Sequence, residues 1–315
     1  MLLRISVFVL GIVGSVAVSD AQECGAAFRF LAIGDMPYSD DEDVKYRRLL
    51  QQSEEEEFAF LLHVGDTKSG GTPCTDQAFE HRRDEFRDYP NPIVYTIGDN
   101  EWTDCHYDGT DPIGRLTKLR ELFFQDETVL RLHSLGAVHQ SRQAEFAPYV
   151  ENYRFTKSRV LFVIVHVCGS GNNRRLDDPA AMQEYTARNA ANLAFLEESF
   201  GEAIRDQPAG VIIAIHANPD FGDRDGTGFV DTLQALEAFM SRYTKPVVCI
   251  HGDSHTHRID HPLKNEAGQA YQHFTRMEVF GSPNISGVTV MVDSRDNAEL
   301  FQFEPYTIQV ENAGP

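Results

Sequence analysis

Three aspartates, each preceded by a glycine, recur along the first third of the sequence. They are Asp35, Asp66 and Asp99, and the third lies in the run Gly98-Asp99-Asn100-Glu101. Each follows an apolar, strand-like segment, and their spacings of 31 and 33 residues each match about one strand-helix-strand unit. Parallel strands bring their carboxyl ends to one edge of a sheet, where α/β proteins bind ligands. Three carboxylates gathered there repel one another, so the pattern predicts bound cations.

Histidines follow two later strand-like segments. His216 comes directly after an apolar run, and Gly252-Asp253-Ser254-His255-Thr256-His257 follows another. Imidazole and carboxylate groups together suit divalent transition metals such as Fe, Mn or Zn. Two such cations that share a carboxylate would clamp a phosphate and lower the pKa of a bound water. The strand ends therefore predict a centre of two divalent metals.

Apolar strand-like runs and amphipathic helix-like runs alternate along the chain and must position these residues. This rhythm predicts an α/β sheet with parallel crossovers, and the stretch Thr275–Phe303 predicts closing antiparallel strands. Strands are expected at Phe28–Ile33, Phe58–Val64, Ile93–Ile97, Arg159–Val167, Val211–Ile215 and Val247–Ile250. Helices are expected at Val44–Gln52, Gln77–Phe86, Ile113–Phe124, Ala180–Ala203 and Val230–Tyr243.

Composition narrows the class of partner. The chain has 315 residues, and 28 basic against 48 acidic side chains give a net charge of −20. That charge disfavours a nucleic-acid polymer and an anionic lipid surface, because both would repel the protein. It favours a small phosphorylated substrate. We expect a single domain over residues 25–310.

The first residues have the pattern of a secretory signal. Arg4 precedes an uncharged run from Ile5 to Ser19, and small residues surround Asp20, which predicts a signal peptide over residues 1–21. The run has 15 residues, fewer than the ~20 that span a bilayer. A membrane anchor or a buried first strand is the alternative interpretation. We expect a secreted or periplasmic protein with no stable membrane insertion after signal cleavage.

Export makes disulfides permissible. Cys74 and Cys105 each follow a glycine-containing strand end, and they are the favoured pair. Cys168 and Cys249 lie in apolar strands and are expected to be buried thiols. Since the chain has five cysteines, at least one has no partner within it.

The order of these motifs resembles the calcineurin-like metallophosphoesterases, whose motifs run D-x-H, G-D, G-N-H-E, H and G-H-x-H. The resemblance extends from Phe28 to about Phe303. It implies a four-layer αββα sandwich of the metallo-dependent phosphatase type. It also implies two divalent metals and hydrolysis of a phosphomonoester or phosphodiester by metal-bound hydroxide.

Some residues match the family motifs directly. Asp35 matches the first aspartate, and Asp66 matches the carboxylate that bridges the metals. His216 matches the fourth-motif histidine, and His255 matches the final histidine when the last motif is anchored on Gly252.

Other residues depart from the motifs. Pro37 stands where D-x-H has its histidine, which removes one ligand. Without a gap, Asp99 takes the asparagine position and Asn100 takes that of the catalytic histidine. A one-residue insertion would instead keep Asn100 as a ligand. Asp253 replaces the first histidine of G-H-x-H, unless His255 and His257 form that pair. The candidate metal ligands are Asp35, Asp66, Asp99, Asn100, His216, Asp253, His255 and His257.

The catalytic position raises a separate question, because the amide of Asn100 cannot titrate near neutral pH as a general acid does. His106, beside Cys105, is a candidate to take over that role, and its alternative interpretation is a surface histidine. His63 reads as a core residue, and Tyr38 as a pocket wall or ordinary packing. The lost histidines also allow a second hypothesis, a non-catalytic descendant that binds metal and a ligand or partner.

Overall fold

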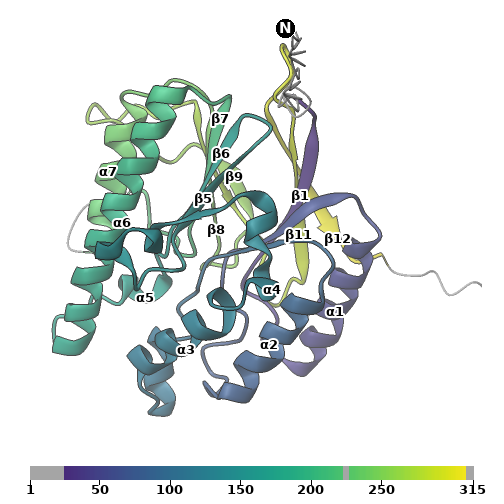
Figure 1. Cartoon of the computed structure of the whole chain (residues 1–315), viewed down its shortest axis with the longest axis vertical. Coiled ribbons are helices and arrows are strands. Elements are labelled where there is room, and N and C mark those ends of the chain that lie inside the picture. Colours follow the sequence, from purple (N-terminus) through teal and green to yellow (C-terminus); the bar gives the residue numbers. More distant parts are fainter. Residues whose placement is uncertain (1–24, 223–226, 310–315) are drawn as a thin grey trace, which may run out of the picture.

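Two β-sheets packed face to face form the centre of the molecule in a computed structural model, which describes residues 25–222 and 227–309 (Figure 1). The predicted signal peptide and Cys24 lie outside the described residues. The first sheet has the order β12-β11-β1-β2-β3, and the second has the order β4-β5-β6-β7-β8-β10-β9. The first contains β1 (Phe28–Ile33), β2 (Phe58–His63), β3 (Ile93–Tyr95), β11 (Ser286–Val292) and β12 (Phe301–Thr307). The second contains β4 (Val138–His139), β5 (Tyr153–Lys157), β6 (Val160–Ile164), β7 (Gly210–Ala214), β8 (Val247–His251), β9 (Arg258–Asp260) and β10 (Phe274–Glu278).

Aromatic rings fill the space between the sheets. Phe30 and Phe60 of the first sheet stack with their centroids 4.7 Å apart. Phe162 of the second sheet meets Phe60 edge-on, with a centroid separation of 5.5 Å. All three side chains are buried, so this layer removes a large apolar area from water and holds the sheets together.

Helices cover the two outer faces and complete the αββα order expected from the family resemblance (Figure 1). Alternate residues of β6 show the layering: Phe162 belongs to the core that includes the first sheet, and Leu161 packs in the core that includes α6 and α7. The helices of the first side are α1 (Asp40–Glu54), α2 (Asp76–Asp88), α3 (Pro112–Phe124) and α4 (Glu127–Leu130). Those of the second side are α6 (Pro179–Asp206) and α7 (Val230–Met240). The short α5 (Gly169–Asn172) follows β6 and lies against Asp99 and Asp253 instead.

The individual strands and helices predicted between Phe28 and Ile250 all form; β1 has the predicted bounds, and the others differ by a few residues at one or both ends. Helix α1 begins four residues before the predicted start at Val44, because the Ser39 side chain caps it by accepting from the backbone N–H of Glu42. Its acidic first turn also complements the helix dipole. Within the described residues, no helix is long and apolar enough to cross a bilayer.

The prediction of consecutive antiparallel strands over Thr275–Phe303 is wrong for the first of them. β10 pairs in parallel with β8 and antiparallel with β9, whereas β11 and β12 pair antiparallel in the other sheet. Since β8 is buried along its whole length, β10 covers an edge that would otherwise leave backbone groups unpaired. The chain then crosses between the sheets along residues 279–285.

A buried polar network supports the segment that follows β6. Arg188 of α6 is fully buried and donates to the backbone carbonyl of His166 and to the side chain of Asn172. The Nδ1 of His166 lies 3.0 Å from Glu151 Oε1, and Arg120 pairs with the same carboxylate. Burial alone would raise the pKa of Glu151, but Arg120 and His166 lower it to about 2. Nothing in the sequence pattern marks these residues as partners, because they come from separate elements.

Acid should destabilise the protein through His166, since burial lowers its pKa to about 4. The unfolded chain then binds more protons than the folded chain between pH 6.5 and 4, so stability is full above pH 6.5 and falls as the pH drops. When the pH is lowered from 7.0 to 5.5, the unfolding free energy of the parent should fall by about 1 kcal/mol more than that of His166→Gln. Urea titrations at the two pH values would measure this difference. Substitution of the exposed His133 by Gln is the control and should leave the slope unchanged. Equal slopes for His166→Gln and the parent would contradict the assignment.

The predicted disulfide is confirmed: Cys74 and Cys105 are bonded, and Cys168 and Cys249 are buried free thiols. The bond closes a segment with a sequence separation of 31 residues.

We expect Cys74→Ala/Cys105→Ala to lower the unfolding free energy by about 3 kcal/mol, because the unfolded chain regains conformational freedom. Dithiothreitol should destabilise the parent by a similar amount and leave the double variant unchanged. A parent insensitive to complete reduction would refute this.

Candidate metal centre

Five strand ends meet where the two sheets share an edge. Asp35, Asp66 and Asp99 follow the parallel strands β1, β2 and β3 of the first sheet. His216 and Asp253 follow the parallel strands β7 and β8 of the second sheet. Four of the five side chains are buried, and that of Asp253 is partly exposed. The convergence predicted from the strand ends is therefore present, and both sheets contribute to it.

The donor atoms form two overlapping groups, each within 4.8 Å: Asp35, Asp66 and His216 in one, and Asp99, His216 and Asp253 in the other. His216 Nε2 lies 2.8 Å from Asp99 Oδ1, 3.4 Å from Asp66 Oδ1 and 4.0 Å from Asp253 Oδ1. Bonds of about 2.0–2.2 Å to one cation would place neighbouring ligand atoms roughly 3 Å apart. The spacing fits ligands gathered around metal ions.

The hydrogen bonding of His216 determines which nitrogen faces the cluster. Its Nδ1 lies 2.8 Å from the carbonyl oxygen of Val64, and a carbonyl can only accept, so Nδ1 carries the proton. Nε2 therefore points at the carboxylates. Burial alone would lower the pKa of His216, but Asp66 and Asp99 raise it well above its ordinary value. A cation bound at Nε2 would take the place of that second proton.

Asp35 provides an independent test of the fit to a metal. It is fully buried, and its Oδ1 accepts from the backbone N–H of Asp253 at 2.9 Å. Its Oδ2 has no hydrogen-bond partner among the described residues. Burial raises the pKa of Asp35 to about 8 and that of Asp66 well above its usual range. An unpartnered buried carboxylate oxygen is costly, and a cation would satisfy it.

The backbone at the site is strained. Asp35, Asp66, Asp253 and His255 have φ angles of 54°, 57°, 77° and 55°, in the left-handed region that costs most residues energy. Close packing accompanies this strain: a Cβ added at Gly98 would collide with Asp66. The glycine of one motif thus leaves room for the carboxylate of another.

The segment after β6 adds a residue that the sequence motifs do not mark. Ser170 Oγ lies 2.7 Å from Asp99 Oδ2 and 2.6 Å from Asp104 Oδ1. Burial would raise the pKa of Asp99, but hydrogen bonds from His216 and Ser170 lower it to about 2. Asp99 is therefore held ionised, as a metal ligand needs to be. Arg188 holds the same segment by donating to the side chain and the backbone carbonyl of Asn172.

Three further predicted ligands, Asn100, His255 and His257, differ in how they contact the two groups. Asn100 donates from its backbone to Asp66 and from its side chain to the Tyr38 hydroxyl. Asp99 belongs to the group with His216 and Asp253. His255 Nε2 lies 3.8 Å from Asp35 Oδ1. His257 belongs to neither group among the described residues, since its Nδ1 bonds to the backbone of Glu278 and its ring stacks on Phe280.

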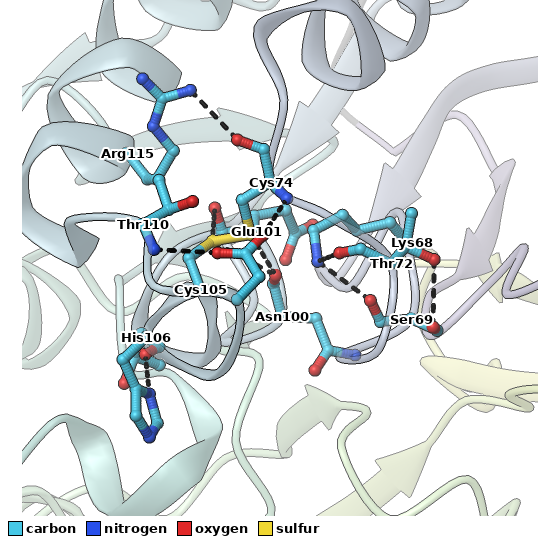
Figure 2. Close-up of a disulfide and its surroundings, with 12 residues drawn as sticks. Lys68, Ser69, Thr72, Cys74, Asn100, Glu101, Cys105, His106, Thr110 and Arg115 are labelled. Atoms are coloured by element: carbon cyan, nitrogen blue, oxygen red, sulfur yellow. Dashed lines mark hydrogen bonds between the residues drawn. A yellow bond between two sulfur atoms is a disulfide. The ribbon is translucent and has the colours of Figure 1, made fainter.

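Three further histidines, His63, His106 and His251, belong to neither group of donor atoms. His63 and His251 are fully buried in the core. His106 is half-buried, and its Nδ1 lies 2.8 Å from the carbonyl oxygen of Thr103. Figure 2 shows His106 next to the Cys74–Cys105 disulfide, with its ring directed away from the sulfur atoms. Its loop reaches the site through Asp104, which contacts Ser170.

Comparisons with known proteins agree with this architecture. The family model for calcineurin-like phosphoesterases matches residues 28–257. A dimetal phosphatase from Danio rerio is 13% identical, with a TM-score of 0.53, and the match covers 90% of this chain and 99% of that one. The calcineurin-like phosphoesterase YfkN from Bacillus subtilis is 11% identical, with a TM-score of 0.44 and coverage of 90% and 91%. None of the curated proteins matches the sequence. On the family match and the shared fold, this chain belongs to the calcineurin-like phosphoesterases.

Proposed function

We propose that this chain is an exported phosphoesterase that uses two divalent transition metals to hydrolyse a small phosphomonoester or phosphodiester. The observation that carries the proposal is the cluster of donor atoms from five strand ends. Within the described residues, the carboxylates of this cluster pair with His216 and His255. Imidazole side chains are themselves common ligands of divalent transition metals. The net charge of −20 favours a small substrate, and the disulfide suits an oxidising compartment.

The chain's own residues would hold and orient the cations. The ligands we propose are Asp35, Asp66, Asp99, Asp253, His216 and His255. When bound, divalent cations supply the Lewis acidity that activates a water and neutralises the charge of a phosphoester. The carbonyls of Val64 and Ser282 accept from the Nδ1 atoms of His216 and His255 and so turn each Nε2 toward the cluster.

The leaving group needs a proton, and Asn100 cannot supply one near neutral pH. We assign this role to His106. Its Nδ1 faces the Thr103 carbonyl, so the proton for transfer would be on Nε2. The neighbouring disulfide at Cys105 and the contact of Asp104 with Ser170 keep the His106 loop beside the centre.

Asp66→Asn should abolish most activity, because it removes a charge from the middle of the donor cluster. We expect a loss of at least about 100-fold in the chelator-sensitive hydrolysis of 4-nitrophenyl phosphate or its bis-ester, with fewer metals per chain by elemental analysis. Asp43→Asn is a matched control. Asp43 also belongs to a group with a histidine and a glutamate, but Arg47 and Arg82 pair with its carboxylate. Activity of Asp66→Asn equal to the parent would refute the proposal.

A parent that binds two metals but hydrolyses no phosphoester would instead favour the non-catalytic hypothesis. That hypothesis is based on the family histidines that this chain lacks, at Pro37 and, in the alignment without a gap, at Asn100. A parent that binds no metal would remove the basis of both hypotheses.

His106→Asn should distinguish substrates by their leaving groups. An alkyl phosphate needs protonation of its leaving oxygen, so we expect kcat to fall by about 10²-fold or more. A 4-nitrophenyl phosphate has a good leaving group, and its kcat should change little. His133→Asn, on an exposed histidine elsewhere, controls for the substitution itself. Equal effects on both substrates would exclude His106 as the proton donor.

A further inference from the structure

We propose that the phenol oxygen of Tyr38 is a ligand of one of the two cations and replaces the histidine that the first motif lacks at Pro37. This inference rests on the proposed metal dependence and adds to it the identity of a ligand. The proline side chain has no donor atom, so the site lacks one metal ligand. Another residue must supply that ligand, or the site binds its cation less tightly.

The Tyr38 hydroxyl lies among the candidate ligands. It is 2.8 Å from Asp66 Oδ2 and 3.3 Å from His255 Nε2. His255 Nε2 is in turn 3.8 Å from Asp35 Oδ1, and donor atoms of Asp35 and Asp66 lie within 4.8 Å of each other. Asp35, His255, Tyr38 and Asp66 are therefore successive neighbours in a ring of four donors, all of them types that bind divalent transition metals. Asp66 also lies next to His216, so it connects this ring to the second group.

The hydrogen bonds direct lone pairs into this ring. The Nδ1 of His255 donates to the carbonyl of Ser282 at 2.8 Å, which leaves the lone pair of the neutral ring on Nε2. The Tyr38 hydroxyl donates to Asp66 and accepts from the side-chain amide of Asn100 at 2.9 Å. A cation held by this oxygen would displace the hydroxyl proton to solvent, as cations do for other protonated ligands.

Two elements fix Tyr38 in this position. Its backbone N–H donates to Glu42 Oε2 in the first turn of α1 at 2.7 Å, and Glu42 Oε1 accepts from Ser282. Its ring meets that of His255 edge-on, with centroids 5.1 Å apart. A tyrosine that only lined a pocket wall would need its ring there, but not a hydroxyl enclosed by three polar groups. The enclosed oxygen favours a ligand.

The experiment compares Tyr38→Phe and Tyr38→His with the parent, and Tyr306→Phe is the control on a partly buried tyrosine of β12. Metal-free protein is titrated with Mn²⁺ by calorimetry. A second sample is loaded with Fe³⁺, and its visible spectrum is recorded, since a phenolate bound to Fe³⁺ absorbs visible light. Near-ultraviolet circular dichroism checks that each variant keeps its tertiary packing.

We expect two Mn²⁺ per chain in the parent and in Tyr306→Phe. Tyr38→Phe should weaken one of the two sites by at least about tenfold, and Tyr38→His should restore it, because imidazole is also a ligand. The visible band should appear in the parent and in Tyr306→Phe and be absent from both Tyr38 variants.

Other outcomes separate this inference from the proposed function. If Tyr38→Phe binds both ions as tightly as the parent, or keeps the visible band, Tyr38 is not a ligand and the proposed metal dependence stands. An iron-loaded parent without the band also overturns the assignment. A parent that binds no metal overturns the assignment and the proposed function together.

Discussion

Repulsion among buried carboxylates is the constraint on which the site depends. Asp35, Asp66, Asp99 and Asp253 approach one another where little water can screen them, and burial raises the pKa of Asp35, Asp66 and Asp253. A fold does not keep such a cluster for stability, because protonation or a cation must offset the charge. Much of the surrounding structure, including the strained strand ends and the hydrogen-bonded histidines, holds these groups together in spite of that cost.

Local signals were enough to predict the frame of the molecule. Apolar runs such as Phe58–Val64 predicted the central strands, and the Gly-Asp repeats predicted which strand ends meet. The same reasoning identified the disulfide, because both cysteines follow strand ends at the same edge. These predictions succeeded because each depends on a short segment and on the rule that parallel strands align their ends.

The parts that were missed depend on contacts between distant segments. Ser170 contacts Asp99 from a turn that Arg188, from α6, holds through a hydrogen bond to Asn172. The parallel pairing of β10 depends on the unfilled edge of β8, which no local pattern reveals. The sequence alone predicts Tyr38 only as a pocket wall or ordinary packing, because the position of its hydroxyl depends on Glu42 and His255.

The donor atoms come from both sheets: Asp35, Asp66 and Asp99 from one, His216 and Asp253 from the other. The burial of apolar surface between the sheets is a non-directional driving force and by itself restrains their relative position only loosely. Coordination bonds would restrain it more tightly, since they are short and directional. A cation at this edge would therefore fix the position of one sheet relative to the other. The thermal stability of the protein would then rise with the concentration of free metal, as for any ligand that binds only the folded state.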